Sequence, residues 1–120
     1  MNVQDTIRAK GAALADAINA RDSARAADHY TADAALMPPG APLQQGRDAI
    51  RTFWQGAIDA GLSNVVLTPD DIAAMESDAV ETGVLTGTMG EARILGKYVV
   101  HWRRDGTDWK LHRDIWNTDT

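Results

Sequence analysis

Two residues near the end of the chain have the types and the spacing that acid/base chemistry requires. His112 and Asp114 are two positions apart in a stretch that predicts a strand, and alternate residues of a strand share a face. An aspartate beside a histidine can fix the tautomer of the imidazole. The alternative is a surface histidine, with Asp114 paired to Arg113 or to an arginine of another strand. The opposite face of this strand is more apolar and could equally point inward; it holds Trp109, Leu111, Arg113 and Ile115. The pattern therefore makes His112 and Asp114 candidates for catalysis, and Trp116 lies on the same face.

Glu81 is the third candidate for catalysis. It lies in a stretch that alternates with period two, on the face that also holds Gly83 and Gly87. Glycines remove side-chain bulk, so this face could border a cavity. A carboxyl group buried there would have a raised pKa, as a general base requires. The alternative is a solvated Glu81 at the wet end of the strand.

Aromatic residues predict a pocket for a ligand. Tyr98 and Trp102 share a strand face, and Trp54 lies on the apolar side of a predicted helix. Phenol and indole groups bring a hydrogen-bond donor into an apolar wall, which suits a flat, weakly polar ligand. Core packing or a dimer interface is the alternative. We expect a pocket between this helix and the sheet, with Asp114 as its ionisable group. The predicted ligand-binding residues are Met37, Trp54, Tyr98, Trp102 and Trp116.

The elements that position these residues follow from the periodicity of the apolar side chains. Helical spacing predicts three helices, and period two with turn signals predicts the strands. Helices come first and an antiparallel meander follows, which indicates an α+β fold in a single domain over residues 1–120. We expect helices over 3–19, from about 22 to 30, and from about 50 to a cap at Gly61. We expect strands over 34–37, over 65–67 and 72–75 as one long or bent strand interrupted at Pro69, and over 79–89, 93–104 and 109–116.

Composition excludes several kinds of protein. The chain has 120 residues, a formal net charge of -5 and no cysteine. Nucleic-acid binding depends on clustered Lys and Arg, and thiol chemistry depends on Cys, so we expect neither. His29, His101 and His112 lack the spacing of metal ligands, and no nucleotide-binding motif is present, so we expect no metal and no cofactor. No apolar stretch reaches the roughly 18 residues of a membrane span, and no signal segment is visible, so we expect a cytoplasmic protein.

A series of short motifs follows in order along nearly the whole chain. A short helix ends at Tyr30, and the chain passes through Ala32-Asp33-Ala34 into an apolar strand that stops at Pro38-Pro39-Gly40. Gly46-Arg47-Asp48-Ala49-Ile50 then opens a helix. Asp78 to Gly83 and Gly96-Lys97-Tyr98 come later, before Asp105-Gly106 and Trp109-Lys110-Leu111. In this order they resemble the ketosteroid-isomerase-like and SnoaL-like (polyketide-cyclase-like) families of the nuclear transport factor 2-like superfamily. The resemblance implies a cone-shaped, cystatin-like fold with one pocket, in which three N-terminal helices pack on a curved, mostly antiparallel sheet.

The same resemblance bears on activity. At the positions where ketosteroid isomerases hold their base, their donor tyrosine and their protonated aspartate, this chain has Pro38, Leu14 and Val99 or Val100. None of these side chains can transfer a proton, so we expect no true steroid isomerase. The resemblance implies an isomerase, cyclase or lyase that acts on a small apolar organic molecule without a cofactor. The alternative is a non-catalytic ligand-binding or dimerisation module of the same fold.

One strand face predicts a partner. Val80, Thr82 and Val84 are followed at the same spacing by Thr86 and Thr88, which gives an apolar or β-branched face that a monomer would leave in water. We therefore expect a homodimer formed through the outer face of the sheet.

Overall fold

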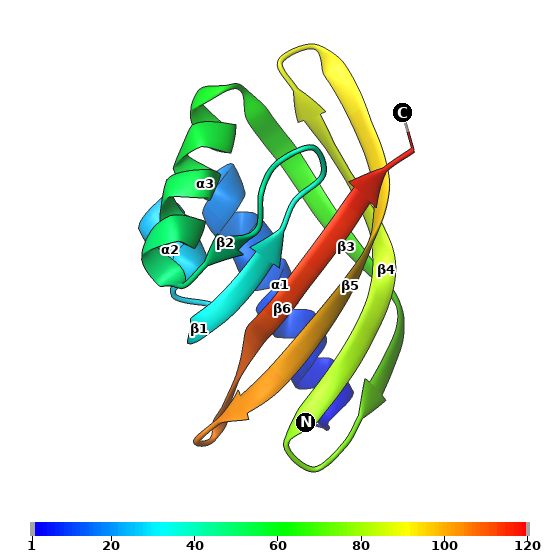
Figure 1. The fold of residues 1–120 in the computed structure, drawn as a ribbon. Coiled ribbons are helices and arrows are strands. Elements are labelled where there is room, and N and C mark those ends of the chain that lie inside the picture. Colours follow the sequence, from blue (N-terminus) through cyan, green and yellow to red (C-terminus); the bar gives the residue numbers. More distant parts are fainter. Residues whose placement is uncertain (1, 120) are drawn as a thin grey trace.

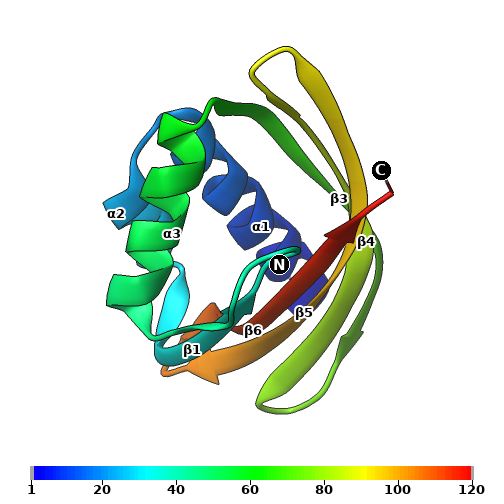
Figure 2. The same cartoon turned by 45° about the horizontal axis from the view of Figure 1, so that its top comes forward.

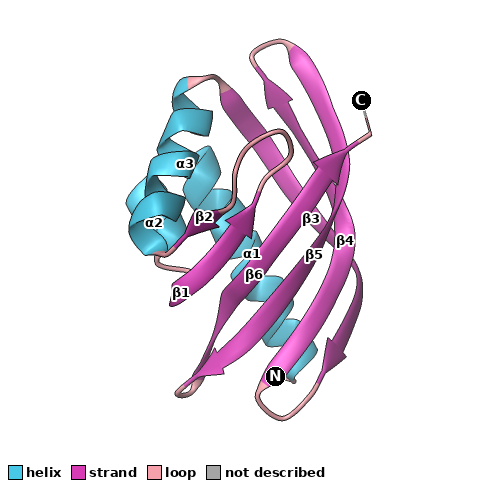
Figure 3. Ribbon diagram, in the orientation of Figure 1, coloured by secondary structure: helices cyan, strands magenta, loops and turns pink. Residues whose placement is uncertain are grey.

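Three helices pack on one curved, six-stranded sheet in the computed structural model, which describes residues 2–119 (Figures 1 and 3). The sheet order is β2-β1-β6-β5-β4-β3, and the β1–β6 pair is parallel while all other neighbours are antiparallel. The α+β fold expected from the sequence is therefore confirmed. The elements are α1 (Val3–Asn19), α2 (Ser23–Ala27), β1 (Tyr30–Met37), β2 (Gln44–Gln45), α3 (Arg47–Asp59), β3 (Leu62–Ala74), β4 (Asp78–Met89), β5 (Ala92–Asp105) and β6 (Asp108–Thr118).

The helices lie on the concave side of the sheet, which curves around them (Figure 2). Asn2 caps α1 by accepting a hydrogen bond from the backbone N–H of Asp5, and Asp22 caps α2 in the same way from Arg25. Gly61 follows α3 with a φ of 112°, a backbone conformation that glycine adopts without strain. The side chains with the least exposure lie between the helices and the sheet: Ile7, Ile18, Tyr30, Leu36, Ile50, Ile58, Trp102 and Leu111.

The strands differ from expectation where pairing depends on distant residues. β1 begins at Tyr30 rather than at Ala34, because it pairs with β6 from the far end of the chain. β3 continues through Pro69 with a shift in register between Pro69 and Asp71. Proline cannot donate a hydrogen bond to a ladder, so the strand bends there instead of ending. The short β2 has no apolar alternation and was not expected from the sequence.

A β-bulge in β6 decides which side chains face the helices. His101 pairs with Arg113, but Trp102 pairs with Leu111, so His112 is an extra residue in the ladder. A bulge of this kind places two residues opposite one and changes the alternation of faces. Leu111 and Asp114 consequently lie on the same, buried face of the sheet.

Over residues 2–119, no helix combines the length and hydropathy that a membrane-spanning helix needs.

Candidate functional site

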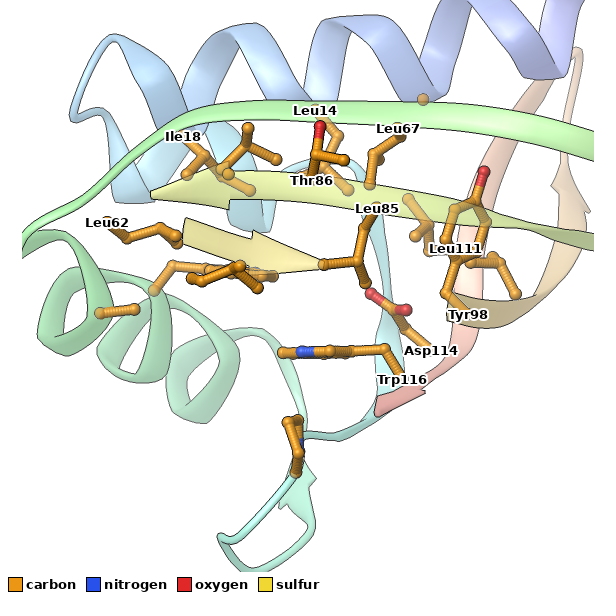
Figure 4. A pocket seen from close by; sticks show the side chains of 18 of the residues that line it. Leu14, Ile18, Leu62, Leu67, Leu85, Thr86, Tyr98, Leu111, Asp114 and Trp116 are labelled. Atoms are coloured by element: carbon orange, nitrogen blue, oxygen red, sulfur yellow. The ribbon is translucent and has the colours of Figure 1, made fainter. Parts of the chain in front are cut away.

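A cavity of about 290 Å³ lies between the helices and the concave face of the sheet (Figure 4). This volume is at the lower end of the range of about 300–1,000 Å³ that is typical of small-molecule sites. Most side chains around it are apolar and come from α1, α3, β3 and β4, among them Leu14, Ile18, Phe53, Leu62, Leu67 and Leu85. Among the described residues that line the cavity, the ionisable ones are Glu81, Tyr98 and Asp114.

Asp114 is a carboxyl group buried against this apolar wall. Its side chain is only 6% exposed, and its Oδ2 accepts a hydrogen bond of 2.7 Å from the hydroxyl of Tyr30. No other described residue donates a hydrogen bond to the carboxyl group. Burial raises the pKa of Asp114 to about 7; the Tyr30 hydrogen bond lowers it, and the charge of Glu81 raises it further. Asp114 therefore exists in both protonation states near neutral pH.

Tyr30 binds Asp114 from β1, the strand that pairs with β6. It is fully buried at the start of β1, and burial, together with the charge of Asp114, keeps its pKa well above the usual value. Its hydroxyl group therefore remains a donor, and it fixes Oδ2 while leaving Oδ1 without a protein partner. Figure 4 shows the carboxyl group of Asp114 directed into the cavity, near Leu85.

Glu81 is the second buried carboxyl group, and both of its oxygens accept hydrogen bonds. The hydroxyl of Tyr98 donates to Oε2, and the indole Nε1 of Trp102 donates to Oε1 over 2.9 Å. Burial raises the pKa of Glu81, whereas these two donors and the charge of Arg8 lower it. Donors to both oxygens stabilise the ionised form and offset part of the effect of burial on the pKa.

Gly83 makes room for the Tyr98 side chain. The two residues are direct partners across β4 and β5, and a methyl group at Gly83 would overlap the phenol ring and the backbone carbonyl of Thr68. The missing side chain therefore lets the Tyr98 hydroxyl reach Glu81. Burial raises the pKa of Tyr98 far above its usual value, so the phenol stays a donor.

Aromatic rings close the cavity on the α3 side. The indole rings of Trp54 and Trp116 stack with centroids 5.5 Å apart and planes 6° apart. Phe53 meets them edge-on, with centroid distances of 5.3 Å to Trp54 and 5.9 Å to Trp116. Trp116 lies beside Asp114 in Figure 4, so an aromatic ring and a carboxyl group face the same space.

Residues 12–112 match the family model of the SnoaL-like domain. The chain belongs to the SnoaL-like family. The search of curated proteins found no match.

Solved structures agree on the fold of this SnoaL-like protein. A ketosteroid isomerase-like protein from Erwinia carotovora atroseptica SCRI1043 is similar with a TM-score of 0.85 and 18% identity, over 100% of this chain and 99% of the other. An NTF-2 like protein of unknown function from Shewanella oneidensis MR-1 has a TM-score of 0.82 and 15% identity, over 94% and 97%. A domain of unknown function with a cystatin-like fold from Nostoc punctiforme PCC 73102 has a TM-score of 0.85 and 15% identity, over 100% and 80%. Identities this low establish the fold alone.

His112 is not among the residues that line the cavity in this SnoaL-like protein, so the structure does not bring His112 and Asp114 together there. The bulge turns His112 to the outer face of the sheet, where its Nδ1 lies 2.8 Å from Thr31 Oγ1 and its Nε2 lies 3.0 Å from Arg103 Nη1. Because arginine can only donate, Nε2 must accept, and Nδ1 carries the proton and donates to Thr31. Burial and the Arg103 charge both lower the pKa of His112.

Met37 is the other predicted residue that the structure places elsewhere. Its neighbour Leu36 is fully buried in the core, and successive strand residues point to opposite faces, so Met37 turns away from the cavity. Pro39 borders the cavity instead. The remaining predicted residues all line it: Trp54, Glu81, Tyr98, Trp102, Asp114 and Trp116.

Tyr30 is the residue of the site that sequence reasoning missed. The sequence pattern predicts a helix that ends near Tyr30, whereas Tyr30 begins β1 and donates a hydrogen bond to Asp114, 84 positions away. Only the parallel pairing of β1 with β6 brings the two together. No local pattern around either residue carries this information.

Proposed function

We propose that this SnoaL-like protein binds a small, largely apolar organic molecule in the cavity, and that Asp114 exchanges a proton with it. The observation that supports the proposal is the Asp114 carboxyl group, which is buried in an apolar wall, has a pKa of about 7 and is directed into the cavity. A group whose pKa lies near the working pH is both a usable base and a usable acid.

The surrounding residues determine which oxygen of Asp114 takes part in the proton transfer and how strongly it binds the proton. Tyr30 holds Oδ2, so Oδ1 is the atom that accepts a proton from the bound molecule and later returns it to another atom of the same molecule. The charge of an ionised Glu81 raises the affinity of Asp114 for that proton. A chemistry of this type is that of a cofactor-free isomerase, cyclase or lyase.

The proposed chemistry is not that of a steroid isomerase. Leu14 and Val100 contribute apolar surface to the cavity wall, and the two carboxyl groups stand on β4 and β6 instead. Any acid/base reaction in this protein would therefore use a different arrangement of groups.

The proposal is tested by following the Asp114 carboxyl group directly. Carbon-13 NMR, with the resonance assigned through Asp114→Asn, should give a pKa of about 7 in the free protein. Saturation with tert-butylbenzene, a neutral apolar probe, should raise that pKa further, because the probe displaces water from around the carboxyl group. Asp16, which is exposed on α1, serves as the internal control, and its carboxyl resonance should not move when the probe is added. A pKa near 4 for Asp114, or a bound probe that leaves this pKa unchanged, would contradict the proposal.

We also propose that two copies of the chain associate through the outer face of the sheet. Val80, Val84, Val99 and Ile115 are between 38% and 46% exposed, and the register of β4, β5 and β6 places them on that face together. Val66 and Leu95 extend the same patch, whereas Thr86, expected on this face, also borders the cavity. Apolar patches on a free surface typically mark interaction sites.

The protein is expected to be a homodimer at micromolar concentration by light scattering. An interface of this kind usually buries more than about 1,000 Å², so a charge in its middle should prevent association. Val84→Lys should therefore give a monomer. Leu43→Lys, at a residue that is 54% exposed but lies just before β2, should leave the dimer intact. A monomeric mass for the unmodified chain would refute the proposal.

A further inference from the structure

Over residues 2–119, the cavity wall carries acidic groups without basic ones. Among the described residues that line it there are two carboxyl groups and no lysine, arginine or histidine. Arg8 acts on Glu81 from α1, but it is about half exposed and does not line the cavity. A buried carboxylate without a positive partner is energetically costly. The site therefore lacks the cation that would balance it.

The groups facing Asp114 do not supply that cation. Tyr30 faces it from β1, Tyr98 from β5 and Glu81 from β4, and each of them is neutral or negative. Glu81 already accepts two hydrogen bonds, so its charge is fixed in place but not neutralised. Oδ1 of Asp114 accepts no hydrogen bond from another described residue, and the carboxyl group is directed into the cavity.

The aromatic wall next to Asp114 suits a cation as well. Trp116 stacks on Trp54, and both rings line the cavity beside the carboxyl group. A positive charge within about 6 Å of an indole ring is attracted to its face, and the attraction grows when water is excluded. Most of the remaining wall is apolar, so the hydrocarbon part of a ligand would lie there and its charged end would meet Asp114 and Trp116.

Building on the proposed function, we infer that the ligand is a small apolar amine, bound with its positively charged nitrogen between Asp114 and Trp116 and with its hydrocarbon part against α1, α3 and β4. A neutral ketone or alcohol is the competing ligand class, because it would accept a hydrogen bond from protonated Asp114. The two classes predict opposite pH dependence. A cation prefers the carboxylate, whereas a neutral acceptor prefers the acid.

Two probes of the same shape separate these classes. Phenyltrimethylammonium carries a permanent positive charge, and tert-butylbenzene is its neutral isostere. Neither probe titrates, so any pH dependence belongs to the protein. Binding is measured by tryptophan fluorescence at pH 6 and pH 8, and the Asp114 pKa is followed by carbon-13 NMR.

The cation is expected to bind more tightly than its isostere at pH 8, and its affinity should rise roughly tenfold from pH 6 to pH 8 as Asp114 loses its proton. The cation should also lower the pKa of Asp114, whereas the neutral probe raises it. Asp114→Asn should abolish the rise with pH, and Asp16→Asn, on the exposed side of α1, should preserve it. The wild-type comparison of the two probes stands even if Asp114→Asn does not fold.

The possible failures are distinguishable. If tert-butylbenzene binds and shifts the Asp114 pKa while the cation binds no better at pH 8, the inference about amines is wrong and the proposed function stands. If the affinity for the cation falls as the pH rises, the inference is likewise overturned. If neither probe binds, the proposed function itself fails.

Discussion

Asp114→Asn is expected to make the protein more stable than the wild type by about 4 kcal/mol at pH 8 and to leave stability almost unchanged at pH 4. Asp114 has a pKa of about 7 when folded, against about 3.9 for an unfolded aspartate. Between these values the folded state binds more protons, so the free energy of unfolding of the wild type falls as the pH rises. The asparagine amide has nearly the same shape as the carboxyl group and does not ionise, so the stability of the variant does not fall in this way as the pH rises.

Urea unfolding of both proteins from pH 4 to pH 8 measures the effect. The two curves of unfolding free energy against pH should diverge between about pH 4 and pH 7 and run parallel above. Asp16→Asn, at an exposed position, is the matched control and should follow the wild type throughout. Parallel curves for Asp114→Asn over the whole range would show that Asp114 is not held in its protonated form.

Gly83→Ala is expected to destabilise the protein by roughly 2–4 kcal/mol, which combines overpacking with the loss of a hydrogen bond to a charged group. The added methyl group would overlap the Tyr98 phenol and the Thr68 carbonyl oxygen, and the carbonyl belongs to the backbone and cannot move aside. Tyr98 must therefore shift away from Glu81. Because the Tyr98 hydrogen bond lowers the pKa of Glu81, its loss should also raise that pKa.

The control for this substitution lies on the same face of β4. A methyl group at Gly87 would meet the Ser63 carbonyl oxygen at 3.3 Å, which requires a shift of only a few tenths of an ångström. Gly87→Ala should therefore cost less than about 1 kcal/mol. Equal losses for the two variants would mean that the Gly83–Tyr98 contact has no special role. Urea unfolding measures the stability, and carbon-13 NMR of Glu81 measures the pKa.

Local pattern predicted most of the fold. The helix predicted over 3–19 is α1 as observed, since its apolar residues recur at helical spacing and Asn2 caps it. The long strands were found because period two is sustained for ten residues or more in β4 and β5. The start of β1 and the two-residue β2 were missed because they depend on pairing with distant segments, and no local periodicity marks them.

The site was only partly predictable, and one reason lies in β6. Strict alternation in β6 offers two inward faces, one with Trp109 and Leu111 and the other with Asp114 and Trp116. The structure uses the first up to Leu111 and the second from Asp114 onward. The bulge between them has no signature in the sequence. Asp114 therefore lines the cavity as expected, whereas His112 does not.

The bulge also makes the chemistry of the cavity depend on the number of residues in β6. A regular strand of the same length, continued from Leu111, would turn Arg113 and Ile115 inward and present a guanidinium group where the carboxyl group now lies. A strand one residue shorter, without His112, would keep Asp114 inward and need no bulge. Among relatives of this protein, the insertion or deletion of one residue in this strand could thus exchange an acidic cavity for a basic one without any substitution. The polarity of the cavity can therefore be compared between relatives only after this strand has been aligned by its hydrogen bonds.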